Sequence, residues 1–536
     1  MAVTLRNRFY GCSLLLPLTL AVPGTATELR VRVSQSVVEQ YRSVGITVTD
    51  PLGGLDAGNG PLRVTMADAG DHRFSFQLAP TGRPGEWSGR FTPTRAGRHT
   101  GAVMLDRGDQ KDLGLVPLIR VRPSHRPGFL RLHPSSRRLL QWTRGGALFP
   151  IGVRVAAEDL GGTDWRAEVL RLRSHGLNFL QIELPGGEDP QALRAVDTAL
   201  LAAEQSGGLG VLLRFGPPDT PADAAAYEEH LRDAVARWAY SPALAGWYLA
   251  AEDAVSANDR VRWAQVIRDA DPYRHLLALP GVPGEVPPGA DFAVAVANWQ
   301  QPGNRFALME RSADGTPVPL PGEDCWQMLA LGGIGVPLVP YHPGAPESTQ
   351  VVGRLAHLAR MARTVPYGSP GTPLAGLLPV DSPGSVVRYG RTIVGWMAPG
   401  AARVLNLPGL PRGRYRARFW DTAREVEVPA LLVWSSGSLA RLELPAGVQT
   451  VYFQVEPARE GAAPASSAAR GHSSRKRSLV GSRSSTRRKK ARSSKPASAR
   501  ARSRSTAKAR TRRSSAAHRR HRHSARRSAH RRSYRR

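Results

Sequence analysis

The sequence predicts a multidomain protein: a central (β/α)8 TIM barrel, an N-terminal immunoglobulin-like β-sandwich, a C-terminal β-sandwich and a disordered basic tail. Three observations support this prediction. The 536 residues exceed the length of one ordinary domain. Short apolar segments alternate with amphipathic helical segments in the middle of the chain. The net charge of +31 is concentrated at the C-terminal end.

Residues 1–26 have the features of a secretory signal peptide in the expected order. Arg6 and Arg8 precede a short apolar stretch from Gly11 to Val22, and small residues suited to signal peptidase end at Ala26. The apolar stretch is too short for a permanent membrane span. We therefore expect an exported protein, periplasmic or extracellular, and the alternative of a buried N-terminal strand or helix remains open.

The chain contains two cysteines. Cys12 lies in the predicted signal peptide, so its removal leaves Cys325 without a disulfide partner in the mature chain. An exported protein without an internal disulfide depends on core packing, which excludes a small disulfide-stapled domain.

Two segments alternate polar and apolar residues as β-strands do. In the first, residues 27–126, the stretch GEWSGRFTPTRAGRHTGAVML (85–105) contains two short strands around a turn. Short strands separated by Gly and Pro over about a hundred residues are typical of an immunoglobulin-like sandwich. Residues 367–457 show the same alternation, as in GRYRARFWD and SLARLELP, and predict the second sandwich.

Eight strand-like segments lie within residues 127–366. In chain order they end at Val155, Leu184, Phe215, Glu252, Pro280, Trp299, Glu310 and Tyr341. Helical patterns separate the early strands: DAAAYEEHLRDAVARW places its large apolar residues on one face. Connections between the fifth and seventh strands are rich in Pro and Gly and too short for full helices. Eight parallel strands favour a closed barrel over an open doubly wound sheet, because no Gly-rich phosphate loop follows any strand.

The active site of such a barrel lies at the C-terminal ends of its strands. The residues found there are Glu183, Arg214, Glu252, Asp253, Asn298, Trp299, Glu310, Tyr341 and His342. Two facing carboxylates suit glycosidic bond cleavage, because a protonated acid donates to the leaving oxygen while an ionised one attacks the anomeric carbon. Trp299 and Tyr341 offer aromatic faces for sugar rings. Asp253 suits the cap of the next helix better than Glu252, and the scattered histidines predict neither a metal nor a cofactor.

The segment GFLRLHPSSRRLLQWTRGGALFPIGVRV (128–155) resembles the barrel entry of bacterial glycoside hydrolases related to family 5 and clan A. The similarity extends through most of residues 30–456. It implies an N-terminal Ig-like domain, a C-terminal β-domain and an oligo- or polysaccharide substrate cleaved with retention of configuration. The resemblance makes Glu252, at the end of strand four, the general acid/base. It makes Glu310, at the end of strand seven, the nucleophile.

Two positions depart from the clan's pattern. The clan usually has Asn directly before the acid/base, where this chain has Ala251. An Arg commonly follows strand two, but this chain has Gln181 and Glu183 there, with Arg214 as a candidate substitute. These departures leave open a different class of function: a catalytically inactive barrel that serves as a scaffold binding glycans or anionic envelope polymers.

Residues 458–536 form the predicted tail. Its last part, 461–536, holds 27 Lys and Arg, five His, no acidic residue and one aromatic, Tyr534. Such a segment cannot bury enough apolar surface to fold, so we expect disorder. Its charge density predicts salt-sensitive binding to anionic polymers, such as envelope polysaccharide or extracellular DNA. A solubilising extension without a dedicated partner is the alternative.

Overall fold

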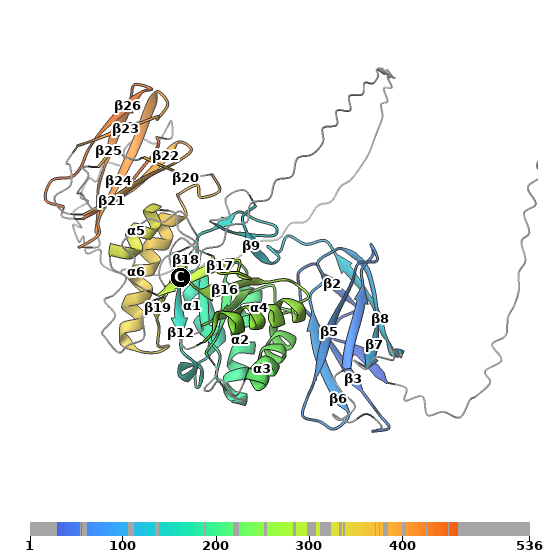
Figure 1. Ribbon diagram of the computed structural model, residues 1–536. Helices are drawn as coiled ribbons and strands as arrows, with labels where there is room; N and C mark the ends of the chain where they lie inside the picture. Colours follow the sequence, from blue (N-terminus) through green and yellow to red (C-terminus); the bar gives the residue numbers. More distant parts are fainter. Residues whose placement is uncertain are drawn as a thin grey trace, which may run out of the picture. The chain divides into compact units, whose positions relative to one another are not determined.

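A computed structural model describes residues 29–53, 55, 62–105, 112–134, 139–186, 189–217, 224–250, 255–281, 286–296, 307–310, 323–331, 335, 338–369, 371–374, 376–378, 384–398, 404–424, 426–448 and 450–458 (Figure 1). The chain divides into two units, Met1–Ala463 and Pro464–Arg536, and all described residues belong to the first. No helix in these described ranges combines the length and the apolar character needed to cross a bilayer.

The N-terminal part consists of eight strands. They are β1 (Arg30–Val33), β2 (Val37–Glu39), β3 (Val44–Thr49), β4 (Leu62–Ala67), β5 (Arg73–Pro80), β6 (Glu86–Phe91), β7 (Gly97–Leu105) and β8 (Asp112–Arg122). Their order is β1-β3-β6-β5-β4-β7-β8-β2, and every recorded pair is antiparallel except β2 with β8. Burial alternates along β3 and β4, so one side of each strand forms the core of this part. The immunoglobulin-like assignment stays a prediction.

The central part contains the eight predicted parallel strands. They are β12 (Gly152–Val155), β13 (Phe179–Glu183), β14 (Gly210–Phe215), β15 (Leu244–Leu249), β16 (Leu276–Pro280), β17 (Phe292–Val296), β18 (Ala307–Glu310) and β19 (Val339–Pro340). Each pairs with the next in sequence from β12 to β18, and β19 pairs with β12. Because the last strand returns to the side of the first, the topology is that of a TIM barrel.

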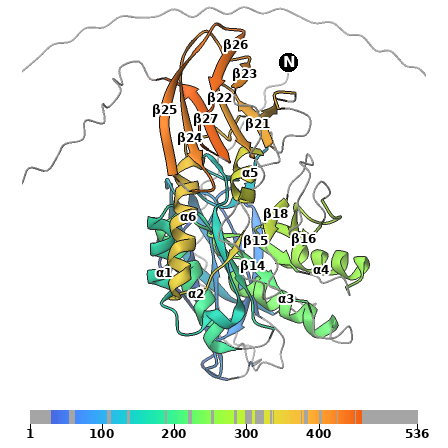
Figure 2. The same cartoon turned by 90° about the vertical axis from the view of Figure 1, so that its left-hand side faces the viewer.

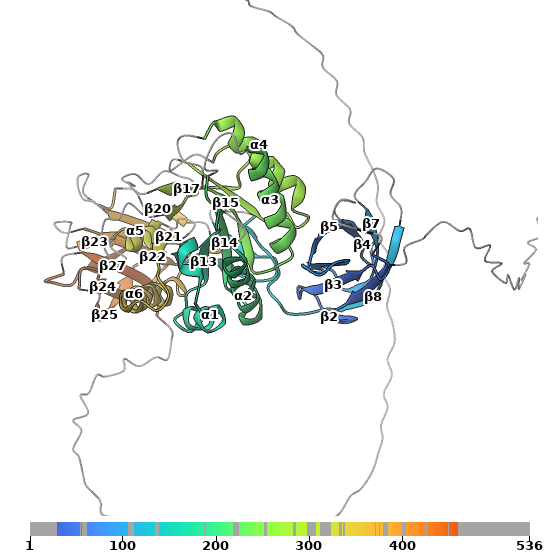
Figure 3. The ribbon, with the colours of Figure 1, turned by 90° about the horizontal axis from the view of Figure 1, so that it is seen from below.

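Helices connect the strands. They are the 3-10 helix η2 (Ala157–Leu160), α1 (Trp165–Ser174), α2 (Pro190–Ser206), α3 (Ala224–Trp238), α4 (Ala257–Ala270), α5 (Glu323–Leu331) and α6 (Pro346–Ala362). Side-chain caps explain where three of them begin, because Asp164, Asp189 and Ser256 accept hydrogen bonds from the first free N–H groups of α1, α2 and α4. Helices α1 to α4 lie outside strands β13 to β15 (Figure 3).

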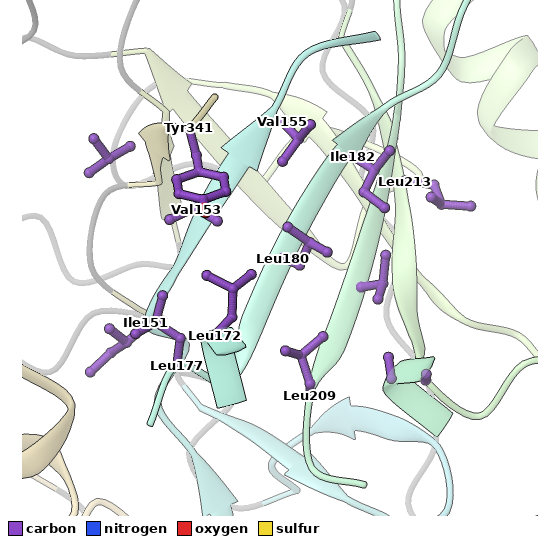
Figure 4. Close-up of a cluster of buried hydrophobic side chains, with 14 of the residues drawn as sticks. Ile151, Val153, Val155, Leu172, Leu177, Leu180, Ile182, Leu209, Leu213 and Tyr341 are labelled. Atoms are coloured by element: carbon purple, nitrogen blue, oxygen red, sulfur yellow. The ribbon is translucent and has the colours of Figure 1, made fainter. Parts of the chain in front are cut away.

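Alternation along the strands divides the barrel into two apolar layers. Val153, Leu180 and Leu213 point outward and pack with α1 and its neighbours (Figure 4). Phe179 and Leu212 belong instead to an inner cluster. A small sheet of β9 (Leu130–Leu132), β10 (Leu140–Trp142) and β11 (Ala147–Leu148) contributes to this inner cluster beside the first residues of several strands. The bottom of the barrel is therefore packed, which leaves the C-terminal ends of the strands for a site.

The C-terminal part is again all β. Its strands are β20 (Gly371–Pro373), β21 (Gly384–Tyr389), β22 (Thr392–Met397), β23 (Val404–Pro408), β24 (Gly413–Asp421), β25 (Val426–Ser435), β26 (Leu439–Glu443) and β27 (Val451–Pro457). The order is β20-β21-β22-β27-β24-β25-β26-β23, and all recorded pairs are antiparallel. Figure 2 labels strands β21 to β27 of this part. Alternate residues of β23 and β26 and of the first part of β24 belong to one apolar core, and the residues between them face outward.

Candidate active site

A polar row crosses three neighbouring strands at the mouth of the barrel. Glu183 at the end of β13, Arg214 on β14 and Tyr248 on β15 are register partners. Their neighbours Ile182 and Leu213 belong to the outer layer, so these three side chains point inward. The Arg214 guanidinium forms an ion pair with Glu183 Oε1 at 2.5 Å and lies 5.9 Å from the centre of the Tyr248 ring.

This row suits substrate binding. The side chains of Arg214 and Glu183 are 18% and 26% exposed, so they reach the opening of the barrel without lying on the open surface. The ion pair and the cation–π contact fix the orientation of the guanidinium. A carboxylate and a guanidinium held in this way present both an acceptor and several donors, as recognition of sugar hydroxyls requires. The sequence analysis selected Glu183 and Arg214 but missed Tyr248, whose inward position follows from alternation along β15.

A second charged side chain lies deeper in the barrel. Arg154 on β12 is 7% exposed and stands in register with Gln181 on β13, which is fully buried. Val153 and Val155 on either side of Arg154 face the outer layer, so Arg154 faces inward. Arginine is rarely buried this deeply, and its place on the inner face of the barrel makes Arg154 a functional candidate. The sequence analysis missed it, although the alternation in GVRV carries the signal.

His342 and Asp159 form a pair at the ends of two adjacent strands. His342 follows β19, Asp159 lies in η2 after β12, and His342 Nδ1 is 2.8 Å from Asp159 Oδ2. The imidazole is 55% exposed and the carboxylate 20% exposed. The carboxylate orients the ring. His342 was predicted at the site, whereas Asp159 was not.

Tyr341 differs from its predicted role as a platform for a sugar ring. Its side chain is 1% exposed and packs in the outer layer beside Val153 (Figure 4). Its hydroxyl donates a hydrogen bond to Glu168 on α1, and the guanidinium of Arg171 lies 5.6 Å from the ring centre. A ring enclosed between strand and helix cannot stack on a substrate. We therefore assign Tyr341 to barrel packing.

The proposed catalytic carboxylates are described only in part. Glu310 is the last residue of β18, in register with Val296 on β17, and only its backbone is described. Glu252 lies outside the described residues, as do Asp253, Asn298 and Trp299. The roles of Glu252, Glu310, Asn298 and Trp299 therefore stay predictions. The role predicted for Asp253 is wrong, because the next described helix after the fourth strand is α4 and its N-cap is Ser256. Within the described ranges, no group of His, Cys, Asp and Glu side chains has the arrangement of a metal site.

One carboxyl group with a strongly lowered pKa, that of Asp271, lies at the N-terminal end of the barrel strands. Asp271, directly after α4, accepts hydrogen bonds from Trp247 Nε1 at 3.0 Å and from the backbone N–H of His275 at 2.8 Å. His275 Nδ1 lies 2.9 Å from the same carboxylate. Burial by itself would raise the pKa of Asp271, but the charge of His275 and these hydrogen bonds outweigh it and lower the pKa to about 2. Because β16 begins just after this pair, we assign the pair to stability rather than chemistry.

A cavity of about 480 Å³ is also not a candidate active site. It borders Leu209 and Ala243, which directly precede β14 and β15. It therefore lies at the N-terminal ends of these strands, whereas catalytic residues of this fold gather at the C-terminal ends.

Solved structures with a similar fold are glycoside hydrolases. A putative glycoside hydrolase from Bacteroides vulgatus ATCC 8482 superposes with a TM-score of 0.58 at 13% identity, covering 79% of this chain and all of that one. A family 5 glycoside hydrolase from the same organism gives a TM-score of 0.45 at 10% identity, covering 63% and 95% of the two chains. No protein-family model matches the sequence. No curated protein matches it either. The first similarity establishes the fold, and at 13% identity it assigns no residue.

Proposed function

We propose that this protein is a retaining glycoside hydrolase in which Glu252 is the general acid/base and Glu310 the nucleophile. The observation that carries the proposal is the strand order of the barrel. Glu310 ends its seventh strand, and Glu252 comes three residues after Leu249, the last residue of the fourth strand, where Tyr248 and then Ala250 lie in the inner cluster. One carboxylate from each of two strands is the arrangement that retaining hydrolysis needs.

The reaction takes place in two steps. Glu310, ionised, attacks the anomeric carbon while Glu252, protonated, donates its proton to the leaving oxygen. Glu252 then removes a proton from water, which attacks the same carbon and releases Glu310. The ion pair of Glu183 and Arg214 binds sugar hydroxyls at the mouth of the barrel. Arg154 supplies positive charge from a deeper level of the barrel interior.

The test compares the wild-type chain with Glu252→Gln and Glu310→Gln on a panel of aryl glycosides and polysaccharides. Loss of a general acid slows a reaction by roughly 10²–10⁴-fold. Glu252→Gln should therefore lower kcat/KM for polysaccharides by about this factor, yet spare kcat/KM for glycosides with a dinitrophenolate leaving group, which departs without a proton. Its kcat on these glycosides should fall, because the second step loses its general base. Glu310→Gln should abolish cleavage of both. Glu229→Gln, an exposed acid on α3, serves as the control with unchanged rates.

Two results would contradict the mechanism. Turnover by the wild type that neither substitution reduces would exclude the assigned carboxylates. A product of inverted anomeric configuration, observed by proton NMR in the first turnovers, would exclude retention and indicate a larger carboxyl separation, about 6.5–9.5 Å instead of about 5 Å.

A non-catalytic scaffold is the second candidate. Ala251, where the resembled hydrolases usually have Asn, and Gln181, fully buried at a level below the mouth, favour it. A scaffold binds glycans without releasing reducing ends. Saturable binding of a polysaccharide by the wild type, combined with no new reducing ends over a day, would support the scaffold against the hydrolase.

The export and tail proposals are independent of the chemistry. The terminal segment 1–26 directs export, and residues 461–536 hold the protein on anionic polymers. Deleting 461–536 should leave hydrolysis of small glycosides unchanged and weaken retention on an anionic polysaccharide at low salt. Equal retention of both forms at low salt would refute the role of the tail.

A further inference from the structure

The C-terminal β-structure exposes a large aromatic side chain on a regular strand. Trp434 on β25 is 57% exposed and Leu432, two residues earlier, is 69% exposed. Val433 and Ser435 between and beyond them are buried. The alternation shows that the chain places Trp434 on the outer face of a well-formed strand. Tryptophan is normally highly buried, so exposure on a rigid element indicates a contact surface.

Cross-strand register puts Trp434 between two arginines. Arg414 on β24 is its direct partner in the sheet. On the other side, Ser435 pairs with Ala440 on β26, so the adjoining outward residue Arg441 lies next to Trp434. Asn406 on β23 is the partner of Arg441. These four side chains, all exposed, form what we call the Trp434 row, and it contains no acidic residue.

The adjacent row has a different character. It contains Arg416 opposite Leu432, with Glu456 and Glu443 as its acids. Glu443 also lies 3.2 Å from Arg441, but both side chains are about two-thirds exposed, and such a surface pair is weak. The positive charge of this face is therefore concentrated around the indole of Trp434, whereas the adjacent row has two acids and one arginine.

We propose that the Trp434 row binds a glycan chain that contains uronic acids. The apolar C–H face of one sugar ring stacks on the indole, and its carboxylate lies between Arg414 and Arg441. The two outer strands of this triplet are two strand spacings apart, roughly 10 Å, which is within reach of one ring and its charged substituent. The guanidinium fork matches a planar carboxylate with two parallel hydrogen bonds. Asn406 adds an amide for sugar hydroxyls.

This binding face is separate from the proposed catalytic centre and from the basic tail. It lies on β23 to β26, not at the strand ends of the barrel. The tail has one aromatic residue, Tyr534, and therefore lacks a comparable stacking surface. Glycan binding by the Trp434 row does not depend on hydrolysis by the barrel, so an experiment can refute one of these two proposals without refuting the other.

The test uses the full chain with ¹⁵N-labelled tryptophan, which gives one indole signal for each of its 11 tryptophans. Trp434→Phe removes one signal and thereby assigns it. Trigalacturonate is the acidic probe and maltotriose the neutral trisaccharide. The Trp434 signal should shift saturably with trigalacturonate only, and Arg414→Ala or Arg441→Ala should each weaken binding roughly fivefold or more. Val426→Ala, which truncates another exposed side chain of β25, is the matched control and should leave affinity unchanged.

Several results would overturn the proposal. An unmoved Trp434 signal would show that the row binds no acidic sugar, and an equal response to maltotriose would show that charge plays no part. A response to phosphatidylglycerol vesicles or to oligodeoxythymidylate, without one to trigalacturonate, would identify a lipid or nucleic-acid surface instead. Because Trp434 is more than half exposed, its substitution leaves the core of the sheet intact, and an unchanged thermal transition verifies this.

Discussion

Replacing Asp271 with Asn should destabilise the bottom of the barrel and change its response to acid. Asp271 is 3% exposed and accepts hydrogen bonds from Trp247 and from the backbone of Tyr273 and His275. Asn has similar volume, but it carries no charge and turns an N–H₂ group toward these donors. Leaving a buried hydrogen-bonding group without its partner generally costs about 1–3 kcal/mol, and several such donors face this carboxylate. We expect a loss of about 3 kcal/mol at neutral pH.

The pH dependence has a defined sign. Since the folded-state pKa of Asp271 is lowered from 3.8 to about 2, its stabilising contribution is complete above pH 3.8 and is lost as the pH falls through about 2. At about 1.4 kcal/mol for each pKa unit, the contribution is roughly 2 kcal/mol. The difference in stability between wild type and Asp271→Asn should therefore shrink by about this amount between pH 5 and pH 2.

Hydrogen exchange of β15 and β16, followed by mass spectrometry, measures the free energy of local opening without requiring the whole chain to unfold together. Asp269→Asn is the matched control. Asp269 is an exposed residue of α4, two positions away, and its replacement should change the opening free energy by less than about 0.5 kcal/mol. A destabilisation below about 1 kcal/mol for Asp271→Asn, or a difference independent of pH, would refute this reasoning.

Three further predictions concern the barrel. Gly246→Ala should destabilise it by about 3 kcal/mol in urea unfolding, because the new Cβ would lie 2.3 Å from the carbonyl oxygen of Leu276; a loss below about 1 kcal/mol would contradict this. Tyr341→Phe should lower stability by about 1 kcal/mol through loss of the hydrogen bond to Glu168, with kcat/KM unchanged. A reduced kcat/KM would return Tyr341 to the substrate site. His342→Ala should change stability by less than about 1 kcal/mol but raise KM, because its ring is exposed at the mouth; an unchanged KM would remove it from the site.

The strands and helices of the barrel were predictable because each depends on a local pattern of apolar residues. The sequence analysis placed a helix on DAAAYEEHLRDAVARW, and α3 buries its stripe of Tyr227, Leu231, Val235 and Trp238. Apolar runs of four to six residues located the eight barrel strands, and their parallel order is confirmed. Three helices begin at side-chain caps, Asp164, Asp189 and Ser256, but the sequence analysis expected Asp253 to cap the helix after the fourth strand, where the structure has Ser256.

The direction of single side chains at the strand ends required the tertiary structure. Tyr341 follows a strand of only two residues, too short for its own alternation to reveal which face points inward. The pairing of that strand with β12 determines which face each of its residues occupies, and it directs the side chain of Tyr341 toward α1. Asp159 next to His342 was likewise not predictable, because 183 residues separate them in the chain.

The sequence by itself therefore determined the strands and helices of the barrel and their order along the chain, since periodicity of two or 3.6 residues is a local property of the backbone. The tertiary structure alone decided which polar groups meet there: Arg214 with Glu183 and Tyr248 inside the mouth. It also decided that Trp434 stands between two arginines on an outer sheet face. Those juxtapositions arise from strand register and closure, which bring together residues that no local pattern relates.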